Sequence, residues 1–148
     1  MGSLRIRAAT VLDAERLAVV HEQCVRESGL AGEIIDQSGL EDRYERALSV
    51  MDATSTWVAT WDGEIVGFVS ATALGPGHAR MLELSSLGVL ASHRNRGIGS
   101  KLLNHAVGTA PCLAWAPAGA ESFYRRHGFE ADSVTETRDG MPFLRVLR

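Results

Sequence analysis

The chain has 148 residues, of which 45% are hydrophobic and 22% are charged, so it can build a compact core and falls outside the disordered class. Its 15 basic and 18 acidic residues give a formal net charge of −3, which excludes the strongly basic surface typical of nucleic-acid-binding proteins. No segment has the roughly 20 consecutive apolar residues of a membrane span, and the first residues lack the apolar core of a signal peptide. We therefore expect one domain over residues 1–148, in the cytoplasm, with neither nucleic acid nor membrane as a partner.

The first part of the chain is predicted to form a strand and then a helix. Residues 4–7 alternate apolar and charged side chains, which is typical of a half-buried strand. Thr10 and Asp13 then offer N-cap chemistry for a helix, and Cys24 lies on the apolar face of that helix. Residues 30–39 have no clear period and are expected to be a flexible connection.

A second helix and a hairpin are expected next. Apolar residues recur with helical spacing from Leu40 to Met51. Residues 57–60 and 65–69 then form two strand-like runs on either side of Asp62-Gly63, which is a strong signal for a two-residue hairpin turn.

The next stretch has the order strand, helix, strand, which implies a parallel pair of strands. Residues 81–89 have strand character, and a helical pattern begins after a polar, arginine-rich turn at Gly97. We expect Pro111 to end this helix, and residues 112–115 to form a short buried strand.

The last part is predicted to contain a helix and a hairpin. Residues 118–127 have helical character and are followed by Gly128, which suits the left-handed backbone that commonly ends a helix. Residues 134–137 and 143–146 flank a second Asp-Gly turn at 139–140.

The segment from Leu87 to Leu103 is the most informative one, because a strand passes through a basic, glycine-containing turn into a helix. The first amides of a helix have no partners within it and point outward at the positive end of its dipole, so they bind anions. Gly97 and Gly99 allow a ligand to approach the backbone closely, and Arg94 and Arg96 add positive charge. The segment therefore predicts a site for a ligand that carries several phosphates.

Two other phosphate-binding loops do not fit this segment. The dinucleotide-binding fingerprint requires a third glycine at the position that Leu102 occupies. A P-loop requires Gly-Lys-Ser or Gly-Lys-Thr, which the segment lacks.

The run Arg94-Asn95-Arg96-Gly97-Ile98-Gly99 resembles the Arg/Gln-x-x-Gly-x-Gly/Ala pyrophosphate motif of the GNAT family of acyl-CoA-dependent N-acyltransferases. Residues 87–89 match the Leu-x-Val of that family's bulged fourth strand, and residues 120–129 resemble its Ala-x-x-Phe-Tyr-x-x-x-Gly-Phe segment. The resemblance covers nearly the whole chain. Pro117 departs from it, because many members have an asparagine there and proline has no N–H to offer.

The resemblance implies an α+β fold with a central mixed, mostly antiparallel sheet of six to seven strands, flanked by about four helices, with a parallel splayed pair at strands four and five. It also implies that acetyl-CoA is the acyl donor and that the acetyl group passes directly to a primary amine of a small molecule or peptide. The donor-binding residues that it implies are Leu87, Gly88, Val89, Arg94, Asn95, Arg96, Gly97, Ile98, Gly99, Ser100 and Ala120. The amide of Val89 would bind the oxyanion.

Acyl transfer to an amine needs a base, because an amine with a pKa near 10.4 is only about 0.04% neutral at pH 7. Glu83 resembles the catalytic glutamate that some relatives carry at this offset, and it would share a sheet face with Leu87 and Val89 unless a bulge intervenes. The alternative is that Glu83 is an ordinary solvated residue and that a water held by Ser85 or Ser86 relays the proton.

The coenzyme A thiolate that leaves also needs a proton donor. Tyr124 resembles the family's acid, and a phenol can protonate a thiolate with only a small uphill step. Phe123 is adjacent, and the two rings point about 100° apart on a helix, so only one can face the core squarely. We expect that one to be Phe123, and Tyr124 to face the donor, with core packing as its alternative.

Metal binding and a covalent cysteine intermediate are not expected, whereas binding without turnover stays open. The five histidines have no metal-ligand spacing, so no metal is expected, and Cys24 is interpreted as a core thiol rather than an acyl-carrying nucleophile. The fold could instead hold acyl-CoA as a sensor or structural ligand without turnover. Residues 27–41 and the last hairpin are expected to wall the acceptor site, and a homodimer is possible.

Overall fold

The computed structural model describes residues 2–27, 37–49, 54–78, 80, 82–117, 119–138 and 141–148. The elements in chain order are β1 (Leu4–Ala8), a 3₁₀ helix (Val11–Asp13), α1 (Ala14–Glu27), α2 (Gln37–Ser49), β2 (Thr54–Trp61), β3 (Glu64–Ala73), β4 (Leu82–Val89), a second 3₁₀ helix (Ala91–His93), α3 (Ile98–Val107), β5 (Cys112–Pro117), α4 (Glu121–Arg126), β6 (Glu130–Arg138) and β7 (Met141–Leu147). Most of the predicted connection before α2, the end of the second predicted helix at Met51 and the turn at 139–140 lie outside the described residues.

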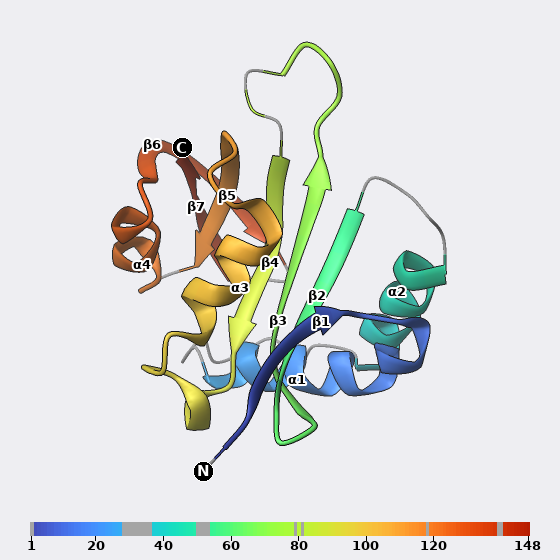
Figure 1. Ribbon diagram of the computed structural model, residues 1–148. Helices are drawn as coiled ribbons and strands as arrows, with labels where there is room; N and C mark the ends of the chain where they lie inside the picture. Colours follow the sequence, from blue (N-terminus) through green and yellow to red (C-terminus); the bar gives the residue numbers. More distant parts are fainter. Residues whose placement is uncertain are drawn as a thin grey trace.

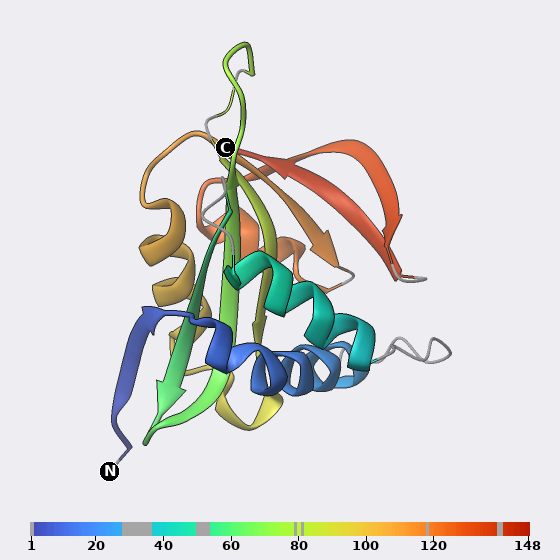
Figure 2. The same ribbon diagram turned by 90° about the vertical axis from the view of Figure 1, so that its right-hand side faces the viewer.

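Within the described residues, a seven-stranded sheet in the order β1-β2-β3-β4-β5-β7-β6 runs through the molecule (Figure 1). β4 and β5 are parallel, and the other neighbouring pairs are antiparallel. The helices α1 and α2 cover one face of the sheet, and α3 and α4 cover the other (Figure 2). This arrangement confirms the α+β fold with a mixed sheet that the resemblance implies.

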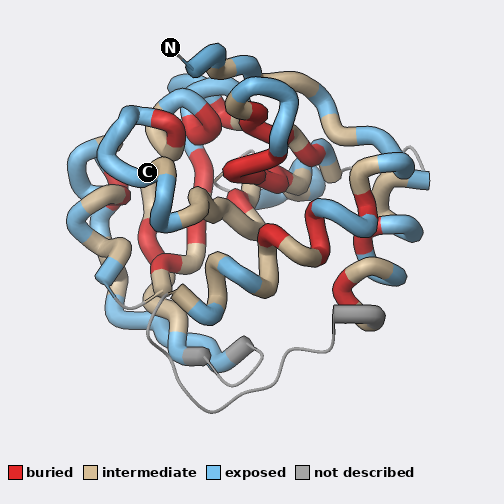
Figure 3. The backbone as a smooth tube through the Cα atoms, turned by 90° about the horizontal axis from the view of Figure 1, so that it is seen from below, coloured by how far each residue is buried: buried red, intermediate tan, exposed pale blue. Residues whose placement is uncertain are grey.

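An apolar cluster on each face of the sheet holds the layers together, and Figure 3 shows the buried residues along the inner faces. The cluster under α3 and α4 includes Leu84, Leu102 and Phe129, and the cluster under α1 and α2 includes Leu17 and Phe68. Full burial of side chains of this size contributes roughly 1.5–3 kcal/mol each. The two clusters therefore fix α1, β4 and α3 relative to one another.

Local signals in the sequence account for several element boundaries. Asp62 and Gly63 adopt positive φ values of 50° and 86°, which are the values that a two-residue turn between twisted strands needs. Asp13 accepts a hydrogen bond from the backbone N–H of Thr10 at 2.8 Å and also pairs with Arg7, so the first helix begins where the sequence predicts. No helix in the described part of the chain is long and apolar enough to cross a membrane.

Two helix ends differ from the prediction. The third helix ends at Val107 rather than at Pro111, because Gly108 adopts a φ of 53° and leaves the helical region first. The fourth helix spans Glu121–Arg126 instead of 118–127, and Gly128 follows it with the expected left-handed φ of 88°.

Candidate functional site

The parallel pair β4 and β5 separates after a short paired stretch. The register pairs Leu82 with Cys112 and Leu84 with Ala114, whereas β4 continues to Val89 without pairing to β5 (Figure 2). We call the resulting gap between residues 85–89 and 115–117 the fork. The parallel splayed pair predicted for strands four and five is confirmed.

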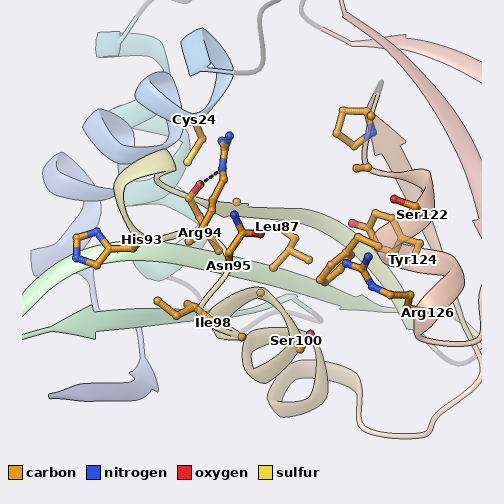
Figure 4. Close-up of a pocket in the computed structure, with 18 of the residues that line it drawn as sticks. Cys24, Leu87, His93, Arg94, Asn95, Ile98, Ser100, Ser122, Tyr124 and Arg126 are labelled. Carbon is orange, nitrogen blue, oxygen red and sulfur yellow. Dashed lines mark hydrogen bonds between the residues drawn. The ribbon is translucent and has the colours of Figure 1, made fainter. Parts of the chain in front are cut away.

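A cavity of about 570 Å³ occupies the fork, and we call it the fork cavity (Figure 4). It extends from β4 to the N-terminal end of α3, and α1 and α4 contribute to its walls. Ten of the eleven residues predicted to bind the donor line it, namely Leu87, Gly88, Val89, Arg94, Asn95, Gly97, Ile98, Gly99, Ser100 and Ala120.

Peptide groups of β4 point into the fork. The N–H of Leu90 donates to the carbonyl of Val66 on β3 at 2.9 Å, so the peptide groups of Val89, which alternate with it, point away from β3. The carbonyl of Val89 accordingly accepts from Nε of Arg94 at 3.0 Å. Leu87, two residues earlier, has the same orientation. The amides of Leu87 and Val89 are therefore available to a ligand in the fork cavity.

The N-terminus of α3 lies at the other end of the cavity with its backbone amides free of side-chain caps from the described residues. Gly97 precedes the helix with a φ of 78°, which favours glycine. A Cβ on Gly99 would lie only 3.2 Å from the ring of Phe123, so a larger residue at this position would have to displace that ring. Unpartnered amides at the positive end of a helix dipole are suited to a pyrophosphate.

The two arginines of the turn point to different places. Arg94 lines the cavity, and its Nη2 lies 3.9 Å from Oε1 of Glu27 at the end of α1. Arg96 instead places its guanidinium 4.9 Å from the ring centre of Trp61 and does not line the cavity. Asn95 between them has a φ of 63°, in the left-handed region of the backbone. The expectation that both arginines face the same ligand is therefore not met.

A bulge at Ser85 corrects the prediction for Glu83. The register of β3 and β4 shifts between the pairs Ser70–Ser86 and Ala71–Leu84, which leaves Ser85 as an extra residue. Leu84 therefore faces α3 together with Leu87, although the two differ by an odd number of positions. Glu83 consequently lies on the opposite face, towards α1 and α2, and does not share a face with Leu87 and Val89.

The carboxylate of Glu83 is held from the neighbouring strand. Nε1 of Trp115 on β5 donates to Oε1 of Glu83 at 3.0 Å. Glu83 does not line the fork cavity, but the register places it beside Leu113, immediately before the strands separate. It therefore lies at the base of the fork, on the face opposite to the side chain of Leu87.

Tyr124 is more buried than Phe123, contrary to the expectation that Phe123 is the core residue, but both residues line the cavity. Tyr124 is the core residue, only 4% exposed, with its ring centre 5.3 Å from that of Phe123 and 5.4 Å from that of Phe129. Phe123 is partly buried, and its ring packs against Gly99 at the cavity wall. Tyr124 also lines the cavity, opposite Leu87 in Figure 4. Among the described residues its hydroxyl has no hydrogen-bond partner, and burial raises its pKa, so it keeps its proton at neutral pH.

Several cavity residues were missed by sequence reasoning. Cys24 was expected in the core, but it is only partly buried and lines the cavity, where a Cβ on Gly88 would meet its Sγ at 3.2 Å. Burial, together with the negative charge of nearby Glu27, raises the pKa of Cys24 to about 12, although Arg94 acts in the opposite direction. The carboxylate of Glu27, which also lines the cavity, accepts from the N–H of Ala91 at 2.9 Å.

The other missed lining residues are His93, Pro117, Gly119, Ser122, Phe123 and Arg126. Helical spacing identifies such residues as part of a helix face but does not show what that face contacts.

No group of three or more potential metal ligands occurs among the described residues. His21 instead contacts the hydroxyl of Tyr44 at 2.8 Å and stacks on Phe68.

Known proteins share both the sequence pattern and the fold. A family model for the GNAT acetyltransferase domain matches residues 52–131, which is more than half of the chain. The chain belongs to the GNAT acetyltransferase family. A probable N-acetyltransferase of Mycobacterium tuberculosis is 28% identical to this GNAT protein over 152 residues, which cover 92% of this chain and 85% of the relative.

Solved GNAT structures resemble this fold along its length. The PaiA N-acetyltransferase of Thermoplasma acidophilum, in complex with coenzyme A, has a TM-score of 0.73 and 21% identity, covering 97% of this chain and 98% of that one. NAA60 of Arabidopsis thaliana, in complex with acetyl-CoA, has a TM-score of 0.71 and 19% identity, covering 99% and 98%.

Proposed function

We propose that this GNAT acetyltransferase transfers the acetyl group of acetyl-CoA directly to a primary amine of a small molecule or peptide. The fork is the main support for this proposal, because its available peptide groups and the uncapped N-terminus of α3 line one continuous cavity. The free peptide groups suit the amide-containing pantetheine arm, and the helix terminus suits the pyrophosphate. The similar structures with coenzyme A or acetyl-CoA, and NAA60 with a bisubstrate analogue, support this use of the fold.

The two ends of the cavity set the direction of the donor. The pyrophosphate belongs at Gly97–Ser100, so the reactive end of the arm lies at the base of the fork, near Leu87. We therefore assign the oxyanion to the amide of Leu87, and the amide of Val89, expected from the sequence to serve this purpose, to the pantetheine arm. Both amides have the required direction away from β3.

Glu83 is proposed as the base, on the acceptor side of the sheet. An amine bound on the face of α1 and α2 can reach the fork through the gap where β4 and β5 have separated. The carboxylate of Glu83 lies beside that gap, so it can accept the proton that the amine must lose. In this proposal, donor and base lie on opposite faces of β4, which the bulge at Ser85 supports.

Direct transfer fits this site better than a covalent acyl-cysteine. Cys24 is the cysteine in the cavity wall, and its raised pKa of about 12 keeps it a thiol near pH 7. The thiolate is the nucleophilic form, so Cys24 has little capacity to attack a thioester.

Tyr124 is proposed as the acid that quenches the thiolate. The burial that raises the pKa of Tyr124 would also raise the pKa of a thiol in the same cavity. The difference between the two pKa values therefore stays small, and the proton transfer costs little free energy. Replacing Tyr124 by Phe is expected to lower the single-turnover rate about 100-fold while the affinity for coenzyme A is kept.

Tyr44→Phe is the matched control, because it deletes a hydroxyl that contacts His21 outside the cavity. We expect its single-turnover rate to match the wild type. Equal rates for the two variants would reduce Tyr124 to a packing residue.

The release of free coenzyme A thiol from acetyl-CoA tests the proposed function. A panel of primary amines, including polyamines, amino acids and peptides with a free N-terminus, should give amine-dependent thiol release together with an acetylated product. Tight acetyl-CoA binding without thiol release for any amine would favour the sensor, which the position of Glu83 outside the cavity wall also permits.

A further inference from the structure

The hydrogen bond from Trp115 to Glu83 joins two strands where their backbone pairing ends. Trp115 lies two residues beyond Leu113, the parallel neighbour of Glu83, and therefore on the same face and towards the fork. Its flanking residues Ala114 and Ala116 are buried under α3 and α4, so the indole projects to the acceptor side. The 3.0 Å contact thus connects β4 to β5 beside the fork.

We propose that Trp115 is a positioning residue that holds the carboxylate of Glu83 at the fork. This inference rests on the proposed function of Glu83 as the base. A glutamate side chain on a strand samples several rotamers, and a hydrogen bond to one oxygen restricts it to those that keep this oxygen at the indole. The hydrogen bond thereby limits the positions from which the carboxylate can accept the proton of the amine.

An indole is suited to this purpose because it donates one hydrogen bond and carries no charge. An arginine in its place would neutralise the carboxylate and weaken it as a base. The cross-strand neighbour of Trp115 on β7 is Arg145, and Asp132 on β6 binds that guanidinium, with Nε 2.9 Å from Oδ2. The positive charge of Arg145 is therefore paired with Asp132, on the side of Trp115 that faces away from Glu83.

A double-mutant cycle tests this inference. Trp115→Phe removes the N–H while keeping an aromatic ring, and Glu83→Gln removes the basicity while keeping an acceptor for the indole. Trp57→Phe is the matched control, because Trp57 contacts His105 on the α3 side and not Glu83. For each variant and the double variant, we would measure kcat, the KM for acetyl-CoA and the affinity for coenzyme A.

We expect Trp115→Phe to lower kcat about tenfold or more, because the carboxylate of Glu83 would then also adopt rotamers that point away from the fork. The KM for acetyl-CoA and the affinity for coenzyme A should stay within about twofold, and Trp57→Phe should behave as the wild type. In the Glu83→Gln background, Trp115→Phe should add less than about twofold, because Trp115 acts through Glu83.

A wild-type kcat for Trp115→Phe, or an equal loss from it in both backgrounds, would overturn the inference while Glu83 remains the base. A large loss of coenzyme A affinity in Trp115→Phe would also overturn it, because Trp115 would then maintain the shape of the fork instead. A wild-type rate for Glu83→Gln would overturn the base assignment together with the inference. Absence of amine-dependent turnover in the wild type would overturn the proposed function itself.

Discussion

Replacing Gly99 by Glu is expected to lower the affinity for coenzyme A about 100-fold or more, as measured by calorimetry. A Cβ at this position already lies 3.2 Å from the ring of Phe123, so the longer side chain must move that ring or enter the cavity. The added carboxylate also places a negative charge at the N-terminus of α3, where the phosphates would bind. Steric crowding and charge repulsion therefore act in the same direction.

Two controls separate these effects. Gly99→Gln has nearly the same size without the charge, so it should lose less affinity than Gly99→Glu, and the difference measures the electrostatic part. Gly75→Glu makes the same change in an exposed loop where a Cβ meets nothing within 4 Å, and it should bind coenzyme A normally. Unaltered binding by Gly99→Glu with an intact fold would show that the phosphates bind elsewhere.

The parts of the site that sequence could predict are those that local chain geometry determines. The passage from β4 through Gly97 into α3 depends on glycine conformations and on the free amides of a helix start, which are readable from neighbouring residues. The Asp62-Gly63 hairpin depends on the turn that these two residues favour. The predicted residues therefore line the cavity with few exceptions.

The parts that sequence could not predict depend on contacts between distant segments. The bulge at Ser85 is a property of the register between β3 and β4, and it reverses the face of Glu83. Arg96 leaves the cavity because the ring of Trp61, from β2, is available to it. The burial of Tyr124 depends on the packing of α4 against the cluster that includes Leu84 and Leu102. None of these contacts leaves a periodic signal in the sequence.

The structure favours Glu83 over a water held by serine as the base to be tested. Ser85 and Ser86 were the alternative supports for a catalytic water, but the hydroxyl of Ser85 donates to the carbonyl of Ser70 at 3.1 Å. The hydroxyl proton of Ser85 is therefore already used in a hydrogen bond to β3. Glu83 has the better position, beside the fork and in contact with Trp115.

Replacing Glu83 by Gln is expected to lower kcat about 100-fold or more with an unchanged affinity for coenzyme A, because general base catalysis typically contributes 10²–10⁴-fold. Gln keeps the size of the side chain and an oxygen that accepts from Trp115, so the fold at the base of the fork should be maintained. Because the variant lacks a base, its rate should depend on amine that is already neutral, and high pH should narrow the gap between the two enzymes. Glu64→Gln, which makes the same change at the exposed start of β3, should reproduce the wild-type profile. Matching pH profiles for the wild type and Glu83→Gln would exclude Glu83 as the base and leave a bound water in that place.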